Sequence, residues 1–284
     1  MAKKHYHSDN YPQILKASGE LQSFSRNKLK RSFRKCGLKP NECEGILTKL
    51  GPPLSKKKVS THDLFQRSYK LIQKASPVAA VNYSLKRALF ELGPAGFHFE
   101  DFIARIAQEL GFTTEVGLIL RGQTVNHEVD ILAHQKGITE LIECKFHNHQ
   151  GIKSDIKTVL YLKARMDDLR AGSHKYKLHD LWIATNTSFT KDAMDYAQFH
   201  GIKLLGTNTP SEENLLDLIK RLKLYPITSL KRLKHHHVER LLNKNILTLQ
   251  DLQESPEEMR HLGLSEREQE LLQFDIQTVL EGHA

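Results

Sequence analysis

Two stretches in the middle of the chain are the most informative about its fold: Glu128-Val129-Asp130-Ile131 and, after a turn, Leu141-Ile142-Glu143-Cys144-Lys145. Both are dense in Ile, Leu and Val, which is typical of buried strands. Side chains alternate along a strand, so Glu143 and Lys145 point to one face while Ile142 and Cys144 point to the other. If the two strands are neighbours, Asp130 joins Glu143 and Lys145 on one surface of a sheet.

These three residues suit a particular chemistry. Two carboxylates and a strand carbonyl are the oxygen ligands that Mg²⁺ prefers. A lysine beside them can orient or help deprotonate an attacking water, or stabilise charge on a phosphate, while the metal ion lowers the pKa of that water. The set therefore predicts hydrolysis of a phosphodiester without a covalent intermediate. The alternative is solvated charge on an ordinary β-hairpin.

Helices and further strands surround the two stretches. We expect helices over residues 99–110, 156–169 and 191–199, and strands over residues 113–120, 128–133, 138–146, 181–185 and 202–205. This order predicts an α/β fold with a mixed sheet. Lys163 and Arg165, on the second helix, are DNA backbone contacts or ordinary surface charges. The polar loop 185–190 is expected at the edge of the site.

The motif resembles that of a known nuclease class. Asp130 followed by Glu143-Cys144-Lys145 is similar to the D…(D/E)-x-K motif of restriction-endonuclease-like nucleases, above all their Mrr-like branch. In that branch a helix bearing Phe-Glu precedes the motif strands, as Phe99-Glu100 does here. The resemblance implies a restriction-endonuclease-like mixed sheet flanked by helices and a Mg²⁺-dependent DNA endonuclease.

The resemblance also assigns roles to residues. Asp130 and Glu143 are implied as metal ligands, and both are implied as catalytic together with Lys145 and the helical carboxylate Glu100. Glu109, on the same helix, is the rival for that helical position. The Mrr-like pattern commonly has Gln-x-Lys, and the Glu143 found here favours metal binding.

Composition and charge limit the remaining possibilities. The 284 residues are 39% hydrophobic and 26% charged, as in globular proteins, and the formal net charge is +9. No apolar run approaches the roughly 18 residues that a membrane span needs, so no membrane association is expected. Three cysteines form neither a disulfide framework nor a paired zinc site, and a cytoplasmic location is the simple expectation.

The basic charge is confined to one part of the chain. Residues 1–92 hold 19 Lys and Arg against 6 Asp and Glu, a net charge of +13, whereas residues 93–224 hold 16 against 17 and residues 225–284 hold 7 against 10. The N-terminal third therefore predicts a polyanionic partner, such as a nucleotide or nucleic acid. A solvated lysine-rich face is the alternative.

The basic part has its own resemblance. Ile14-Leu15-Lys16, Gly19, Phe24 and the helix opening Lys28-Leu29 resemble the start of an ATP-cone, the regulatory nucleotide module of ribonucleotide reductases. The resemblance covers residues 12–92 and implies a mainly helical domain that binds ATP or dATP. Lys16 and Lys28 would meet the triphosphate, and Thr61 the base or sugar. Gln22 stands where such modules frequently have a glutamate. A small helical DNA-binding domain is the alternative.

The last sixty residues contain only short expected helices. Residues 225–284 resemble a helix-hairpin-helix module, in which backbone N–H groups of the turns meet DNA phosphates. The first turn has Asn245 in place of the usual glycine, while the second keeps Gly263. The negative charge of this part leaves protein docking as an equal alternative.

Together these patterns predict four parts: a polar tail over 1–11, an ATP-cone over 12–92, a nuclease domain over 93–224 and a helical module over 225–284. The leading function is a Mg²⁺-dependent DNA endonuclease regulated by ATP or dATP. The alternatives are a nucleotide-responsive DNA-binding regulator with an inactive nuclease fold, and a scaffold. Because ATP-cones often associate when they bind nucleotide, a homo-oligomer is left open.

Overall fold

A computed structural model describes residues 13–16, 19–51, 58–93 and 97–282. The predicted polar tail over 1–11 and most of the linker 93–96 lie outside these residues. The chain forms two compact units, Met1–Ser84 with Phe274–Ala284, and Leu85–Gln273. The predicted boundaries near 93 and 225 both fall within the second unit, and they remain predictions.

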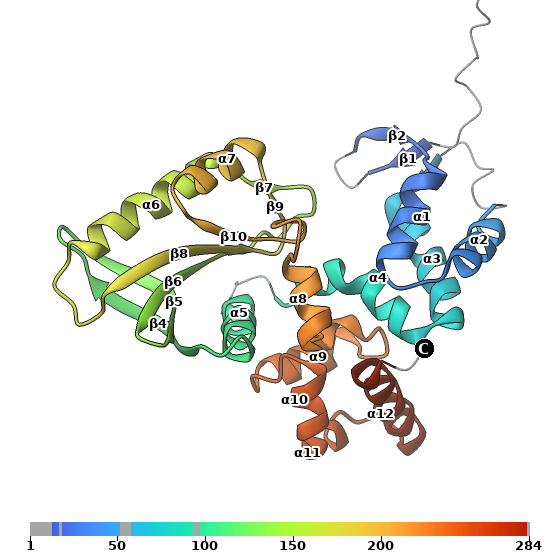
Figure 1. Ribbon diagram of the computed structural model, residues 1–284. Coiled ribbons are helices and arrows are strands. Elements are labelled where there is room, and N and C mark those ends of the chain that lie inside the picture. The colour runs from blue at the N-terminus through green and yellow to red at the C-terminus, as the bar shows by residue number, and fades with distance from the viewer. Residues whose placement is uncertain (1–12, 17–18, 52–57, 94–96, 283–284) are drawn as a thin grey trace, which may run out of the picture. The chain divides into compact units, whose positions relative to one another are not determined.

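The first unit combines a small sheet with helices. Its elements are β1 (Gln13–Leu15), β2 (Leu21–Ser23), α1 (Arg26–Lys35), α2 (Pro40–Lys49), β3 (Lys58–Ser60), α3 (Thr61–Ala75) and the start of α4 (Pro77–Phe90). The strand order is β2-β1-β3, with β2 antiparallel and β3 parallel to β1. These elements, which make up the N-terminal part of the unit, are coloured blue to cyan in Figure 1.

Local sequence signals explain where its helices begin. Ser25 caps α1 by accepting a hydrogen bond from the backbone N–H of Lys28 at 3.3 Å, and Ser60 caps α3 in the same way. The apolar stripe of α1 buries Phe33 completely, in a core shared with Leu47 of α2 and Ile72 of α3.

The second unit is built on a five-stranded mixed sheet. Its elements are α5 (Phe97–Glu109), β4 (Thr113–Arg121), β5 (Asn126–Gln135), β6 (Ile138–Lys145), β7 (Lys153–Ser154), α6 (Ile156–Arg170), β8 (Leu178–Thr185), β9 (Ser188–Phe189), α7 (Lys191–Phe199), β10 (Lys203–Leu205) and α8 (Leu215–Leu222). The order in the sheet is β10-β8-β6-β5-β4. The first three of these strands are parallel, and β6, β5 and β4 pair antiparallel.

The predicted α/β fold with a mixed sheet is thus confirmed, and the structure adds the small β7–β9 pair and helix α8. Helices α6 and α7 cover one face of the sheet and α5 lies against the other (Figure 1). The core on the α6 side contains Leu141, Leu181 and Ile183 from the strands, and Val159 and Met166 from α6. A buried sheet with such helices fixes the positions of strand residues that face them.

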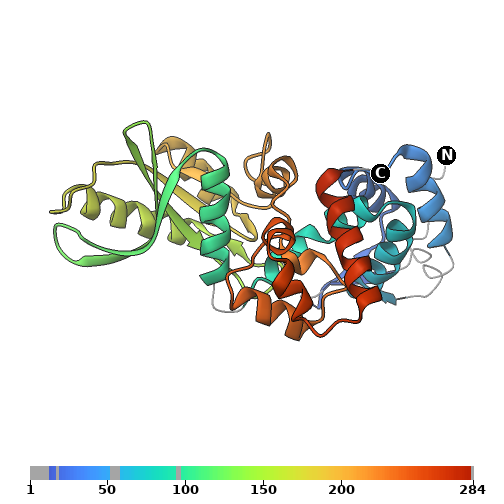
Figure 2. The ribbon, with the colours of Figure 1, turned by 90° about the horizontal axis from the view of Figure 1, so that it is seen from below.

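Further helices follow α8, and the last of them spans 16 residues, longer than the short helices expected there. The elements after α8 are the 3₁₀ turn η2 (Ile227–Ser229), α9 (His235–Leu242), α10 (Leu249–Glu254), α11 (Pro256–Arg260) and α12 (Glu266–Glu281), shown in orange to red in Figures 1 and 2. Within the second unit, Asp251 of α10 forms an ion pair with Arg105 of α5 at 2.7 Å. Thr228 Oγ1 donates to the carbonyl of Ala88 at 2.8 Å. Within the described ranges, no helix combines the length and apolar character that crossing a membrane would require.

Candidate active site

The site lies where β5 and β6 separate. The ladder between these strands reaches Ile131 opposite Ile142, and the same register places Asp130 opposite Glu143. At this point the carboxylate of Asp130 accepts a hydrogen bond from the backbone N–H of Cys144 at 2.6 Å. A side-chain oxygen therefore takes the place of a ladder carbonyl. Residues directly opposite each other share a face of the sheet, so Asp130 and Glu143 lie together, as the alternation of side chains predicts.

Glu143 is a buried carboxylate with one oxygen free. Its Oε2 lies 2.9 Å from Nη1 of Arg165 on α6, and its Oε1 is buried without a hydrogen-bond partner among the described residues. Burial, followed by the negative charge of Asp130, raises the pKa of Glu143 to about 8 against the opposing effect of Arg165. Burial also raises the pKa of Asp130, against the hydrogen bond from Cys144.

Glu100 joins this group from the first turn of α5. Burial and then the charge of Asp130 raise the pKa of Glu100 to about 7. Glu100 also contributes to the raised pKa of Glu143, so the three carboxylates affect one another. Glu109, the rival residue, is exposed at the far end of the helix. The electrostatic interaction with Asp130 favours Glu100 over Glu109 as the helical residue.

Lys145 is exposed at the end of β6, and its positive charge opposes, to a small extent, the rise that burial causes in the pKa of Asp130. The strand is held there by polar side chains from the end of β8. Thr185 Oγ1 donates to the carbonyl of Lys145 at 2.7 Å. The amide of Asn186 bonds both the N–H and the C=O of His147 at 2.9 Å.

The first residues of the loop 185–190 bond to the end of β6, next to the site, and their side chains are turned into the protein. Thr185, Asn186 and Thr187 are buried and bond to neighbouring protein groups. A buried polar side chain needs hydrogen-bond partners inside the protein, and Thr185 and Asn186 find theirs in the backbone at the end of β6 and just after it. Their effect is to hold the backbone that carries Lys145.

The donor set suits a hard divalent cation. In the part of the chain that the structure describes, no three His, Cys, Asp or Glu side chains are grouped closely enough to hold a metal ion. Mg²⁺, however, usually keeps several waters and takes only one or two carboxylates from a protein. Asp130 and Glu143 supply two carboxylates, and the unpartnered Oε1 of Glu143 is the type of oxygen that such an ion requires.

Comparison with known proteins gives matches over much of the chain. Residues 94–210 match the family model described as restriction endonuclease, and residues 225–280 match the one described as AF1548-like, C-terminal. An uncharacterized protein from Archaeoglobus fulgidus is 35% identical over 164 residues, which are 57% of this chain and 91% of that protein. The crystal structure of the protein of unknown function AF1548 is 31% identical with a TM-score of 0.54, and the match covers 66% of this chain and 98% of that one.

The chain belongs to the AF1548-like family. Its residues 94–210 form a restriction-endonuclease-like domain, and residues 225–280 form an AF1548-like C-terminal domain. MspJI restriction endonuclease in complex with a 27-mer oligonucleotide is also similar, with 14% identity and a TM-score of 0.37 over 59% of this chain and 36% of that one. Similarity at this level carries no argument about fold or activity.

The N-terminal candidate residues of this AF1548-like protein fall into two groups. Lys16 and Thr61 directly follow β1 and β3, which are parallel, so they lie at the same end of the small sheet. Lys28 follows the end of the antiparallel β2, which is the opposite end. Lys16 pairs with Glu20 at 2.9 Å, and Gln22 lies opposite Ile14 in the middle of the sheet. A shared nucleotide contact for all four residues remains a prediction.

Arg165 is the site residue whose role the sequence did not reveal. Lys163 pairs with Asp167 one turn later on the exposed side of α6, as a surface charge does. Arg165 instead turns inward to Glu143 and also donates to the backbone carbonyl of Glu128. The sequence does hold a signal for this difference. Lys163 and Arg165 are two residues apart on a helix, so their side chains point about 200° apart around the helix axis and cannot both face solvent in the same way.

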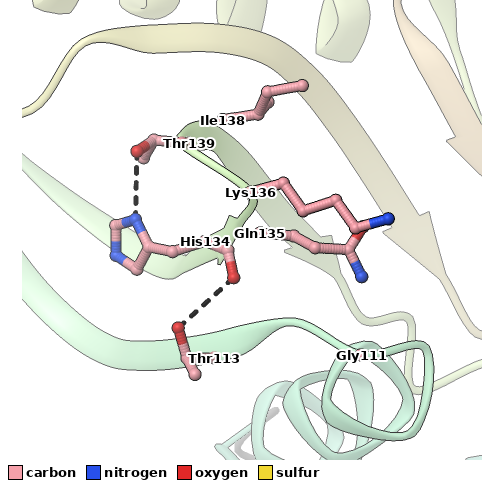
Figure 3. Close-up of a pocket in the computed structure, with 8 residues that line it drawn as sticks. Gly111, Thr113, His134, Gln135, Lys136, Ile138 and Thr139 are labelled. Atoms are coloured by element: carbon pink, nitrogen blue, oxygen red, sulfur yellow. Dashed lines mark hydrogen bonds between the residues drawn. The ribbon is translucent and has the colours of Figure 1, made fainter.

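A separate pocket of about 510 Å³ lies at the turn between β5 and β6 (Figure 3). His134, Gln135 and Lys136 line it together with Thr113 of β4, and His134 Nδ1 lies 3.0 Å from Thr139 Oγ1. None of the four predicted catalytic residues lines this pocket. The carboxylate group at Asp130 is therefore a different site.

Proposed function

We propose that this AF1548-like protein is a divalent-metal-dependent DNA endonuclease. The observation that carries the proposal is the meeting of Asp130 and Glu143 on adjacent strands, with Lys145 two residues beyond Glu143. The restriction-endonuclease family match over 94–210 supports a nuclease. Phosphodiester hydrolysis by a metal ion needs carboxylate ligands and a positive group near the phosphate, and these residues supply both.

In this proposal each residue has a separate task. Asp130 and Glu143 hold Mg²⁺, which when bound would lower the pKa of water and neutralise charge on the phosphate. Lys145, exposed beside them, orients the water or stabilises charge on the phosphate. Glu100 adds a third negative group that assists at the same place.

A second candidate is a DNA-binding regulator with an inactive nuclease fold. The ion pair between Arg165 and Glu143 favours it, because an arginine already neutralises one of the two expected metal ligands. The two candidates differ in cleavage. The regulator binds DNA and leaves it intact in the presence of Mg²⁺.

The test is cleavage of supercoiled, linear duplex and single-stranded DNA in Mg²⁺, in Mn²⁺ and in EDTA. We expect wild-type protein to cut in either metal and not in EDTA. Asp130→Asn should abolish cutting, and Lys145→Ala should slow it by roughly 10²–10⁴-fold, as loss of a proton-transfer group does. Glu109→Gln is the matched control, since it removes an exposed carboxylate from α5. Equal cleavage by wild type, Asp130→Asn and Lys145→Ala would contradict the assignment, and DNA binding without cleavage would support the regulator.

We further propose that the N-terminal part binds ATP or dATP and so regulates the protein. The net charge of +13 over residues 1–92 suits a triphosphate. Lys16 and Thr61 lie at one end of the small sheet, where β1 and β3 finish. A protein that binds neither ATP nor dATP would contradict this part of the proposal and leave the nuclease part intact.

A further inference from the structure

We infer that Arg165 is a positioning residue for the metal site. It holds one oxygen of Glu143 so that the other oxygen is presented to a divalent ion. The inference rests on the proposed function only in assuming that Asp130 and Glu143 bind such an ion. It assigns Arg165 no contact with the reacting atoms.

The contacts of Arg165 join three elements. From α6, its Nη1 lies 2.9 Å from Oε2 of Glu143 on β6, and its Nη2 donates to the carbonyl of Glu128 on β5. The side chains of Arg165 and Glu143 are only 13% and 6% exposed. A planar guanidinium can make both contacts at once because its donors have a fixed fork geometry. One side chain therefore connects the two motif strands just where they separate.

The two oxygens of Glu143 are in different situations. Oε2 is bound by Arg165, whereas Oε1 is buried with no hydrogen-bond partner among the described residues. A buried acceptor without a partner is costly, and this one sits beside the carboxylate of Asp130, whose charge acts on it. A divalent ion between the two carboxylates would satisfy Oε1 and offset the repulsion. Arg165 leaves that oxygen available.

A competing role for Arg165 predicts the opposite change in metal affinity when the residue is replaced. If its positive charge merely stood in for the metal ion, removing it would let the ion bind more tightly. The geometry favours positioning, because the ion has Oε1 to bind and Arg165 occupies only Oε2. Removing one partner of a buried ion pair also leaves the other charge unpaired, so Glu143 would no longer be held as an ordered carboxylate. The guanidinium is further held by the ring of Tyr161, 5.9 Å away.

The experiment measures Mn²⁺ binding by calorimetry to full-length, metal-free protein. Groups that orient metal ligands typically contribute about 10–100-fold in affinity, so we expect Arg165→Gln to raise the Kd by that factor. Arg165→Lys should lie between Arg165→Gln and wild type, since it keeps the charge and loses the second contact. Lys163→Gln is the matched control on the same helix and should leave the Kd unchanged, because Lys163 pairs with Asp167.

An unchanged or lower Kd in Arg165→Gln would overturn the inference, and so would a wild type that binds no Mn²⁺. If Arg165→Gln does not fold, Arg165→Lys decides, and a Kd equal to that of wild type would count against positioning. Parallel cleavage assays separate the two proposals. If Mn²⁺ binding depends on Arg165 as expected but the wild-type protein cuts no DNA, the nuclease assignment is wrong and the inference stands. If the wild-type protein cuts DNA but the Kd for Mn²⁺ is the same in wild type and Arg165→Gln, the inference is wrong and the nuclease assignment stands.

Discussion

Among single residues, the carboxyl groups of Glu100, Asp130 and Glu143 all have raised pKa values, because burial and neighbouring negative charge disfavour their charged forms. Glu100, Asp130 and Glu143 act on one another, and burial removes the water that would solvate them. Arg165 opposes this effect at Glu143 but does not cancel it, since the pKa of Glu143 still rises to about 8. Clusters of this type are a common mark of functional sites.

This crowding predicts how stability depends on pH. The pKa values of Glu100 and Glu143, about 7 and about 8, lie above the roughly 4.3 of an unfolded glutamate. The folded protein therefore binds protons more tightly than the unfolded chain, and stability is lost as pH rises through these values. We expect the Tm of metal-free protein in EDTA to fall between pH 5 and pH 9.

The matched comparison is Glu143→Gln, which removes one of these groups. The difference in Tm between wild type and Glu143→Gln should change with pH by at least about 2–4 °C, the shift that ~1 kcal/mol produces in a unit of this size. Glu109→Gln should follow wild type across the range. A wild-type Tm that stays level or rises with pH in EDTA would contradict the crowding of carboxylates.

At the scale of elements, α6 is fastened to the hairpin of β4 and β5. The carboxylate of Asp168 accepts from the backbone N–H of Thr124 at 3.0 Å and lies 2.8 Å from Nε2 of His127. These contacts lower the pKa of Asp168 to about 2, with the His127 contact as the main cause. Because Arg165 lies on the same helix, this attachment also helps to set its approach to Glu143.

The attachment requires a close approach of two backbones. A Cβ on Gly172, just after α6, would lie 2.2 Å from the carbonyl oxygen of Arg121 and 2.7 Å from Cα of Gly122. Backbone cannot move aside as a flexible side chain can, so Gly172→Ala should force the helix end and the hairpin apart. We expect a loss of about 1–3 kcal/mol, as for overpacked sites, measured by denaturant unfolding.

Gly45→Ala in α2 is the control for that substitution. A Cβ at Gly45 meets nothing within 4 Å, so an alanine there should stabilise the helix by roughly 0.5–1 kcal/mol. Hydrogen exchange at Gln123 and Thr124 reports the hairpin directly, since their N–H groups bond to Asp168. Unchanged stability and exchange in Gly172→Ala would show that the contact is not needed.

At the scale of the whole molecule, charge separates the parts of the chain. The positive excess lies within residues 1–92, whereas residues 93–284 carry a small negative excess. Within the second unit, the ion pair of Arg105 with Asp251 joins the C-terminal helices to α5, which carries Glu100. The candidate nucleotide residues Lys16 and Thr61 thus belong to the first compact unit, whereas Asp130 and Glu143 belong to the second.

Regulation by nucleotide is therefore a prediction about the whole molecule. We expect ATP or dATP to change the rate of DNA cleavage by about 5–150-fold, the range of a typical coupling between two sites. Lys16→Ala should lose this response, because Lys16 is the cation at the end of β1. Lys74→Ala, which removes an exposed cation from α3, should keep it. Rates that are equal with and without nucleotide would count against regulation.

Local sequence patterns were enough to predict most helices and strands of the sheet and the face of β6 that carries Glu143 and Lys145. The periodicity of apolar residues predicted the strands and helices of the sheet, and α7 begins and ends where expected, at Lys191 and Phe199. Alternation along β6 placed Glu143 and Lys145 together because it depends only on neighbouring residues. The short β7 and β9 escaped prediction, since two-residue strands have too few side chains to show a period.

Which distant residues join Asp130 and Glu143 could be seen only after the elements were packed together. Glu100 and Glu109 lie on one helix, and after α5 packs against the sheet the charge of Asp130 acts on Glu100. Lys163 and Arg165 look alike as cations of one helix, yet only Arg165 reaches Glu143. The physical reason is that local spacing fixes the face on which a side chain lies, whereas burial and pairing with a group twenty or more residues away depend on how whole elements pack.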